Sequence, residues 1–290
     1  MSLESININI KWKKNDDKRD AGLFIPESIR YIRNNRYGDD KVYNSLDICY
    51  PKDKENKKLP VIINVHGGAY VYGNTEVYQF YCADLARRGF TVVNFNYRLA
   101  PKYKFPAPIE DLSNVIEWLE SKEERYPMDL SNVFLTGDSA GAQLASQYAA
   151  IYSNDEYRKL FRLSKPKIKI KGLSLACGLY DIEKHVSGKL TGLIKDYFTS
   201  EPLRFGEKLK VMDYIKEGYP PCYIFSAPGD FLLENVEPMV EHLKSHGIEC
   251  ESKIYGDEKT EHVFHINIKS SLANEANDDQ CAFMKRHITK

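Results

Sequence analysis

Short apolar runs alternate with amphipathic helical segments along most of this chain, and this alternation limits the possible folds more than any other feature. Runs such as 61–65 and 91–95 are apolar throughout, which is typical of strands buried on both faces. The predicted strands are 45–50, 61–65, 91–95, 132–136, 168–176, 222–226 and 250–255, and the predicted helices are 75–88, one that begins near Pro108, 140–150, 232–245 and 271–287. Strands that alternate with helices form a mostly parallel central sheet flanked by helices. We therefore predict an α/β fold.

The chain has 290 residues and contains no internal repeat or linker that would divide it, so we expect a single domain over 1–290. Two segments do not follow the alternation. One is the polar, charged stretch 11–41, and the other is 182–219, which is rich in tyrosine and phenylalanine. We expect 182–219 to lie over the sheet as a small cap, and 11–41 is a second candidate for it.

The charge balance and the cysteines indicate the setting in which the protein works. With 41 basic and 41 acidic side chains the formal net charge is zero, which argues against nucleic acid or an anionic membrane as a partner. No apolar stretch approaches the roughly 20 residues of a membrane span, and the first residues do not resemble a signal peptide. The six cysteines are scattered singly, as expected for free thiols in a cytoplasmic protein. The sequence leaves open whether the chain forms a homo-oligomer.

The most informative motif is Gly137-Asp138-Ser139-Ala140-Gly141, which lies between a predicted strand and a predicted helix. G-x-S-x-G in this setting places a serine hydroxyl on a tight, exposed turn at the N-terminus of a helix, where negative charge is favoured. Ser139 is therefore a candidate nucleophile. The alternative is a glycine-flanked helix start in which Ser139 only caps the helix.

A second motif, His66-Gly67-Gly68-Ala69, follows the predicted strand 61–65 directly. Hydrolysis of an acyl group requires hydrogen-bond donors aimed at the oxyanion, and N–H groups of a small-residue turn after this strand can supply them. We expect the N–H groups of Gly68, Ala69 and Ala140 to form this oxyanion hole. The alternative is a plain turn, and for His66 itself we favour a structural role over proton transfer.

A serine nucleophile needs a histidine as base and a carboxylate that orients the histidine. Asp230 follows the predicted strand 222–226, and two histidines, His262 and His265, follow the strand 250–255. The chain order Ser, Asp, His is the order used on α/β-hydrolase sheets. Asp230 could instead cap the helix near residue 232, and Glu234 is the less favoured acid. The two histidines could also suggest a metal pair, but no third ligand lies at suitable spacing.

Together these residues resemble the hormone-sensitive-lipase-like carboxylesterases of the α/β-hydrolase fold. The resemblance spans about 45–287 and includes, besides the motifs above, Tyr97-Arg98-Leu99-Ala100-Pro101, Phe105-Pro106-Ala107, Asp111 and His262-Val263-Phe264. The family places its base in a His-x-Phe segment, which selects His262 as the catalytic histidine. Ala69 stands where the family has a third glycine, and the two cap segments look short. Asp138 and the Arg98/Asp111 pair are interpreted as structural.

The resemblance implies a serine carboxylesterase that works through an acyl-enzyme, with Ser139, Asp230 and His262 as its triad. It implies no metal and no organic cofactor. The short cap segments and the lack of any long lipid-binding helix favour small, short-acyl esters as substrates. Two alternatives stay open at this point. The same triad cleaves amides in amidases, formamidases and peptidases of this fold, and a ligand-binding protein can keep the fold without catalysis.

Overall fold

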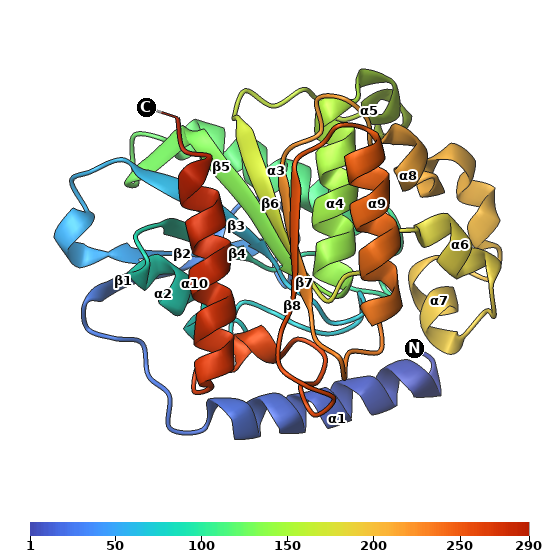
Figure 1. Ribbon diagram of the computed structural model, residues 1–290, viewed down its shortest axis with the longest axis horizontal. Coiled ribbons are helices and arrows are strands. Elements are labelled where there is room, and N and C mark those ends of the chain that lie inside the picture. The colour runs from blue at the N-terminus through green and yellow to red at the C-terminus, as the bar shows by residue number, and fades with distance from the viewer. Residues whose placement is uncertain (290) are drawn as a thin grey trace.

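The structure, a computed structural model, describes residues 1–289 and is built around one eight-stranded sheet (Figure 1). Across the sheet the strands follow the order β1-β2-β4-β3-β5-β6-β7-β8. β2 runs antiparallel to both of its neighbours, whereas all other pairings are parallel. The strands are β1 (Ile29–Arg36), β2 (Ser45–Pro51), β3 (Leu59–Val65), β4 (Thr91–Phe95), β5 (Met128–Asp138), β6 (Ile170–Ala176), β7 (Cys222–Ser226) and β8 (Cys250–Ile254). The mostly parallel α/β sheet predicted from the sequence is confirmed.

Helices cover both faces of this sheet. The α-helices are α1 (Leu3–Asp20), α2 (Gln79–Arg87), α3 (Ala107–Lys122), α4 (Ala140–Ser153), α5 (Asp155–Phe161), α6 (Ile182–Ser187), α7 (Gly192–Tyr197), α8 (Val211–Tyr214), α9 (Val236–Ser245) and α10 (Ser271–Arg286). Short 3₁₀ turns are η1 (Lys52–Lys54), η2 (Pro202–Leu209), η3 (Leu233–Asn235) and η4 (Phe264–Ile266). No helix within residues 1–289 has the length and apolar character needed to cross a membrane.

Two hydrophobic clusters, one on each face, hold the layers together. The larger one joins the sheet to α3, α4 and α9, and the smaller one joins it to α2 and α10. The apolar stripe of α3 shows why the sequence pattern works, since its members are all fully buried: Ile109, Leu112, Val115, Ile116 and Leu119. Burial of such side chains contributes roughly 1.5–3 kcal/mol each relative to exposure. The cysteines are free, and all but the half-buried Cys250 are buried.

The structure differs from the sequence-based expectation in several places. The predicted helix 75–88 begins only at Gln79, because Asn96 Oδ1 accepts the Thr75 N–H at 2.7 Å and Asn94 Nδ2 donates to the Thr75 carbonyl at 2.8 Å, which holds Thr75 in a loop. The short helix α5 was not predicted. Within 11–41, the end of α1 and the whole of β1 are regular structure, and β1 extends the edge of the sheet.

The segment 182–219 forms α6, α7, η2 and α8, which lie together at one side of the molecule (Figure 1). α1 runs along the bottom of the molecule in the same view and contacts α7. There Asp196 Oδ2 accepts hydrogen bonds from the Ser2 N–H and the Ser5 hydroxyl, both at 2.7 Å. The Leu193 N–H donates to Glu4 Oε2 at 3.0 Å. The N-terminal helix and the 182–219 segment are thus in direct contact.

Candidate active site

The G-x-S-x-G motif forms the turn between β5 and α4, as predicted. Ser139 has φ 53° and ψ −119°, a backbone conformation with positive φ that L-residues rarely adopt. Both glycines of the motif are sterically required: a Cβ atom on Gly137 would lie 2.5 Å from the Gly141 carbonyl oxygen, and one on Gly141 would lie 1.9 Å from that of Val65. The turn presents a partly exposed Ser139 at the N-terminus of α4, where the helix dipole favours negative charge.

The loop after β3 turns through three consecutive residues with positive φ. Gly68, Ala69 and Tyr70 have φ values of 120°, 50° and 65°. A Cβ atom on Gly68 would lie 2.0 Å from the carbonyl oxygen of Tyr72, so only glycine fits there. Within residues 1–289, no protein acceptor takes a hydrogen bond from the N–H of Gly68, Ala69 or Ala140. These three N–H groups, which the sequence nominates as oxyanion donors, are therefore available to a ligand oxygen.

His66, at the start of this loop, is a structural histidine. Its side chain is fully buried and stacks on Tyr97 with ring centroids 4.0 Å apart. Nδ1 donates to the Gly67 carbonyl at 2.7 Å, and the Tyr97 hydroxyl donates to the His66 carbonyl at 2.9 Å. Burial lowers the pKa of His66 to about 4, so the ring is neutral at physiological pH. The interpretation that His66 shapes the loop agrees with these contacts.

Asp230 and His262 form a hydrogen-bonded pair. His262 Nδ1 donates to Asp230 Oδ1 at 2.6 Å, and the Leu232 N–H donates to the same oxygen at 2.9 Å. The other carboxylate oxygen, Oδ2, accepts from the Ser226 hydroxyl at 2.5 Å. Burial alone raises the pKa of Asp230, but the hydrogen bonds from His262, Ser226 and Leu232 outweigh it and hold the pKa at about 2. The carboxylate thus stays ionised and fixes the imidazole with Nδ1 protonated, which leaves Nε2 as the basic nitrogen.

The other candidates for acid and base lie elsewhere. His265 is fully buried, and its ring meets Tyr81 and Phe225 edge-on at centroid distances of 5.2 Å. Burial lowers the pKa of His265 to about 3, so it stays neutral. Glu234 lies exposed in η3, and no hydrogen bond joins it to a histidine within residues 1–289. The structure therefore brings His262, and not His265, to Asp230.

The ends of neighbouring parallel strands connect the nucleophile to this pair. The Ser139 N–H donates to the carbonyl of Ala176, the last residue of β6, at 2.9 Å. The Sγ atom of the next residue, Cys177, accepts the N–H of Val263 at 3.4 Å. Val263 directly follows His262 in the chain. Residues 176–177 thus bridge the turn that carries Ser139 and the loop that carries His262, at the carboxyl edge of the sheet where α/β proteins place their ligands.

Asp138 links the nucleophile turn to the oxyanion loop, in agreement with its interpretation as a structural residue that braces the active-site loops. Its Oδ2 accepts from the Tyr78 hydroxyl at 2.8 Å, and the same hydroxyl oxygen accepts the Gly67 N–H at 3.0 Å. Asp138 Oδ1 is buried and has no partner within residues 1–289. Burial raises the pKa of Asp138 to about 6. Tyr78 was missed by the sequence analysis, because nothing in its own surroundings distinguishes it from a core tyrosine.

Two further residues near Asp230 also escaped the sequence analysis. Ser226 is the last residue of β7, and Cys177 lies beside it with Oγ and Sγ 3.9 Å apart. Cys177, Asp230 and His262 are the residues of the described chain, 1–289, whose ligand atoms lie close enough to suit a metal ion, all within 4.8 Å of one another. Two of these groups already bind each other through a hydrogen bond, and burial raises the pKa of the Cys177 thiol well above its usual value.

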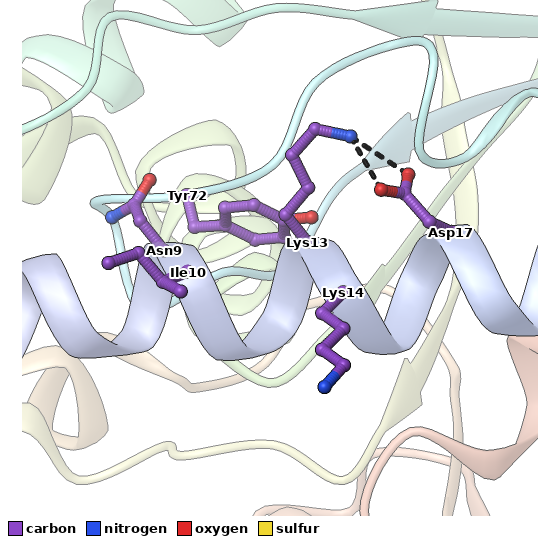
Figure 2. A pocket seen from close by; sticks show the side chains of 6 residues that line it. All are labelled: Asn9, Ile10, Lys13, Lys14, Asp17 and Tyr72. Atoms are coloured by element: carbon purple, nitrogen blue, oxygen red, sulfur yellow. Dashed lines mark hydrogen bonds and ion pairs between the residues drawn. The ribbon is translucent and has the colours of Figure 1, made fainter.

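α1 closes over the segment that follows the oxyanion loop. Asp16 Oδ2 accepts the Tyr72 hydroxyl at 2.7 Å, and Arg19 donates to the Val77 carbonyl at 2.9 Å. Figure 2 shows the open groove along α1 beside Tyr72, in which Lys13 pairs with Asp17 at 2.8 Å. Neither Ser139 nor His262 lines this groove, which is therefore a surface feature outside the candidate site.

A family model described as the alpha/beta hydrolase fold matches residues 62–266, which include the oxyanion loop, Ser139, Asp230 and His262. The chain belongs to this α/β-hydrolase family. The match agrees with the resemblance drawn from the motifs. Among curated proteins, the α/β hydrolase is similar to the acetyl esterase of Salmonella schwarzengrund, with 27% identity over 239 residues that cover 77% of this chain and 71% of the relative. The acetyl esterase of Salmonella choleraesuis is 28% identical over 235 residues, covering 76% and 70%.

Solved structures agree on the fold of this α/β hydrolase. Esterase B of Lactobacillus rhamnosis superposes with a TM-score of 0.86 at 23% identity, covering 97% of this chain and 94% of that chain. The hyperthermophilic esterase of Pyrobaculum calidifontis gives a TM-score of 0.75 at 21% identity, covering 98% and 94%.

Proposed function

We propose that this α/β hydrolase is a serine esterase in which Ser139, His262 and Asp230 form the catalytic triad. The observation that carries the proposal is the 2.6 Å bond from His262 Nδ1 to Asp230, at the same sheet edge as the turn that exposes Ser139. An imidazole held in this tautomer can accept a proton at Nε2, which a serine hydroxyl needs in order to act as a nucleophile. The curated relatives named acetyl esterases support an ester as the substrate.

In the proposed reaction, the Ser139 hydroxyl oxygen attacks the ester carbonyl carbon while its proton passes to His262 Nε2. The negative oxygen of the tetrahedral intermediate accepts hydrogen bonds from the N–H groups of Gly68, Ala69 and Ala140. Collapse of the intermediate breaks the bond to the alcohol oxygen, which takes the proton from His262, and leaves an acyl-enzyme. Water, deprotonated by His262, then attacks the acyl carbon, and the carboxylic acid leaves as Ser139 regains its proton. Loss of one such donor costs a hydrolase about 3–4 kcal/mol of transition-state stabilisation.

We further propose that the chain forms a single hydrolase domain over 1–290, of which residue 290 lies outside the described residues. In this proposal α1 and the segment 182–219 form a small cap on that domain. The contacts of Asp196 with Ser2 and Ser5 join the two cap parts. The ring of Tyr197, from α7, stacks on that of Tyr70 in the oxyanion loop at a centroid distance of 3.8 Å. A cap packed this closely on the oxyanion loop favours small, short-acyl esters. The remainder of 11–41 contributes β1 to the sheet instead.

The setting and partners belong to this proposal as well. Free cysteines, five of them buried, support a cytoplasmic location, where thiols stay reduced. The balanced charge supports a small-molecule ester, and not nucleic acid or a membrane, as the partner. All the groups of the proposed reaction come from one chain. The chemistry therefore requires no second copy of the chain, and a homo-oligomer is compatible with it.

The experiment that tests this function compares hydrolysis of p-nitrophenyl acetate, butyrate and octanoate by the wild type and Ser139→Ala. Ser121→Ala is the matched control, because Ser121 is exposed on α3 and its hydroxyl donates to the nearby Trp118 carbonyl, within the same helix. We expect the wild type and the control to turn over, and Ser139→Ala to lose roughly 10⁴-fold or more of kcat.

The same comparison includes two outcomes that contradict the proposal. Equal rates for wild type and Ser139→Ala would show that Ser139 is not the nucleophile. Faster cleavage of the octanoate than of the acetate and butyrate would contradict the short-acyl preference. Acetyl p-nitroanilide is assayed in parallel, and a higher kcat/KM on the anilide than on the acetate ester would favour the amidase alternative.

A further inference from the structure

The two carboxylate oxygens of Asp230 are held by different groups. Oδ1 accepts from His262 Nδ1 and from the Leu232 N–H, whereas Oδ2 accepts from the Ser226 hydroxyl at 2.5 Å. Ser226 is fully buried at the end of β7, four residues before Asp230. A buried hydrogen bond to an ionised carboxylate is about twice as strong as one between neutral groups. Because His262 and Leu232 both donate to Oδ1, the Ser226 hydroxyl is the group that binds Oδ2.

The sheet positions the Ser226 hydroxyl for this contact. The Ser226 carbonyl accepts the Tyr255 N–H at 2.9 Å, and the preceding carbonyl, of Phe225, accepts the Cys177 N–H at 2.8 Å. The backbone of residues 225–226 is thus held by the residues that directly follow β6 and β8. The hydroxyl has one proton to donate, and the Asp230 oxygen at 2.5 Å is a much better acceptor than the Cys177 sulfur at 3.9 Å.

We propose that Ser226 is a positioning residue for the proposed triad: its hydroxyl restricts rotation of the Asp230 carboxylate and so holds His262, through its Nδ1–H, in the orientation that the proposed reaction requires. This inference rests on the proposed function. With Oδ2 bound, the carboxyl plane turns less easily about the Cβ–Cγ bond, and the plane fixes the direction in which Oδ1 receives the His262 proton. The same hydrogen bond draws negative charge towards Oδ2, away from the imidazole.

Removal of the hydroxyl therefore has two effects that can be separated. A carboxylate held at Oδ1 alone turns more easily than one held at both oxygens, and this lowers kcat because His262 spends less time in the productive orientation. More negative charge on Oδ1 stabilises the imidazolium form of His262, which shifts the acid limb of kcat/KM to higher pH. The other titratable groups near His262 are Asp138, His265 and the Cys177 thiol, and they are the same in wild type and variant.

The test measures kcat/KM on p-nitrophenyl acetate from pH 5 to 9 for the wild type, Ser226→Ala and Ser226→Thr. Ser174→Ala is the matched control: Ser174 is an equally buried strand serine on β6, but its hydroxyl donates to the neutral Gln280 amide at 2.9 Å. We expect Ser226→Ala to lose about tenfold in kcat at pH 8 with KM little changed, and its acid limb to move up by about half a pH unit. Ser226→Thr keeps an O–H donor and should recover most of both effects.

A fall in kcat for Ser174→Ala as large as that for Ser226→Ala, or a fall in Ser226→Ala with no shift of the acid limb, would overturn the proposal. If Ser226→Ala does not fold, Ser226→Cys takes its place, since a thiol is of similar size but a weaker donor, and it should move both quantities in the same direction. Proton NMR of the low-field His262 Nδ1–H gives a readout without turnover. If the wild type cleaves no ester but this resonance still moves in Ser226→Ala and not in Ser174→Ala, the proposed function fails and the positioning role stands.

Discussion

Asp138 is a buried carboxyl, and one of its oxygens has no partner among residues 1–289, so its ionisation should cost the folded protein measurable stability. Burial raises its pKa from 3.8 to about 6 in the folded protein. The folded state therefore binds more protons than the unfolded chain between these values, so the stability that this group contributes is complete below pH 3.8 and is lost as the pH rises through 6. From the two pKa values, the free energy of unfolding at pH 5 is about 1.6 kcal/mol, and at pH 8 roughly 3 kcal/mol, lower than it would be with Asp138 protonated in both states.

Asp138→Asn removes this charge and keeps an oxygen that can accept the Tyr78 hydroxyl. The free energy of unfolding of Asp138→Asn, relative to the wild type, should therefore increase by roughly 1.5 kcal/mol between pH 5 and pH 8. Urea unfolding of both proteins at the two pH values measures this difference. All other titrating groups contribute equally to both proteins, so their pH dependence cancels in the comparison. The exposed Asp39 supplies the control, and Asp39→Asn should show nearly the same difference from the wild type at pH 5 and pH 8.

A constant difference for Asp138→Asn at both pH values would refute this reasoning. It would mean that Asp138 ionises as easily in the folded protein as in the unfolded chain, and that an additional donor reaches its unpaired oxygen. A difference that decreases towards pH 8 would reverse the sign of the argument, because it would show that the folded state prefers the ionised carboxylate.

Three further predictions concern other parts of the site and the surface. Asp230→Asn should lower kcat on p-nitrophenyl acetate by about 10⁴-fold, because an amide that donates to His262 selects the wrong tautomer, and a near wild-type kcat would contradict the triad. Gly141→Ala should lower the free energy of unfolding by at least about 2 kcal/mol in urea titrations, since its Cβ would lie 1.9 Å from the Val65 carbonyl oxygen. In the native protein a thiol reagent should label Cys250 first, and faster as the pH approaches its pKa of about 11, whereas rapid labelling of several thiols would show that the buried cysteines are accessible.

The parts of the fold that the sequence predicted are those in which each element has its own local signal. The apolar run of β7 matches the predicted 222–226 without any shift, and α4 begins at Ala140 as its small residues and the preceding motif indicate. β1 gave no such signal, because it is an edge strand with only Ile29 fully buried and its register with β2 shifts between Ile32 and Asn35. An edge strand that covers little core leaves little apolar periodicity to detect.

α1 escaped prediction for a related reason. Its inward face consists mainly of polar residues, such as Ser5, Asn9 and Asp16, which are held by hydrogen bonds to the cap and to the loop after β3. A helix whose inner face makes polar contacts does not show the apolar stripe by which amphipathic helices are recognised. Its position depends on partners far away in the sequence, and no window of neighbouring residues contains them.

The candidate site shows the same division between local and distant signals. Ser139 and the glycines around it were predictable because a tight turn restricts which residues fit, and this restriction is visible within five residues. The positions after β7 and β8 predict an aspartate and a histidine for the site. The choice of His262 over His265 depended on the family resemblance, and the 2.6 Å contact between His262 and Asp230 now supports it independently. Ser226 and Tyr78 gave no signal, because a buried hydroxyl is recognised only by the group it contacts. The residues that react are thus marked by local chemistry, whereas the residues that hold them in place become visible only when the chain is folded.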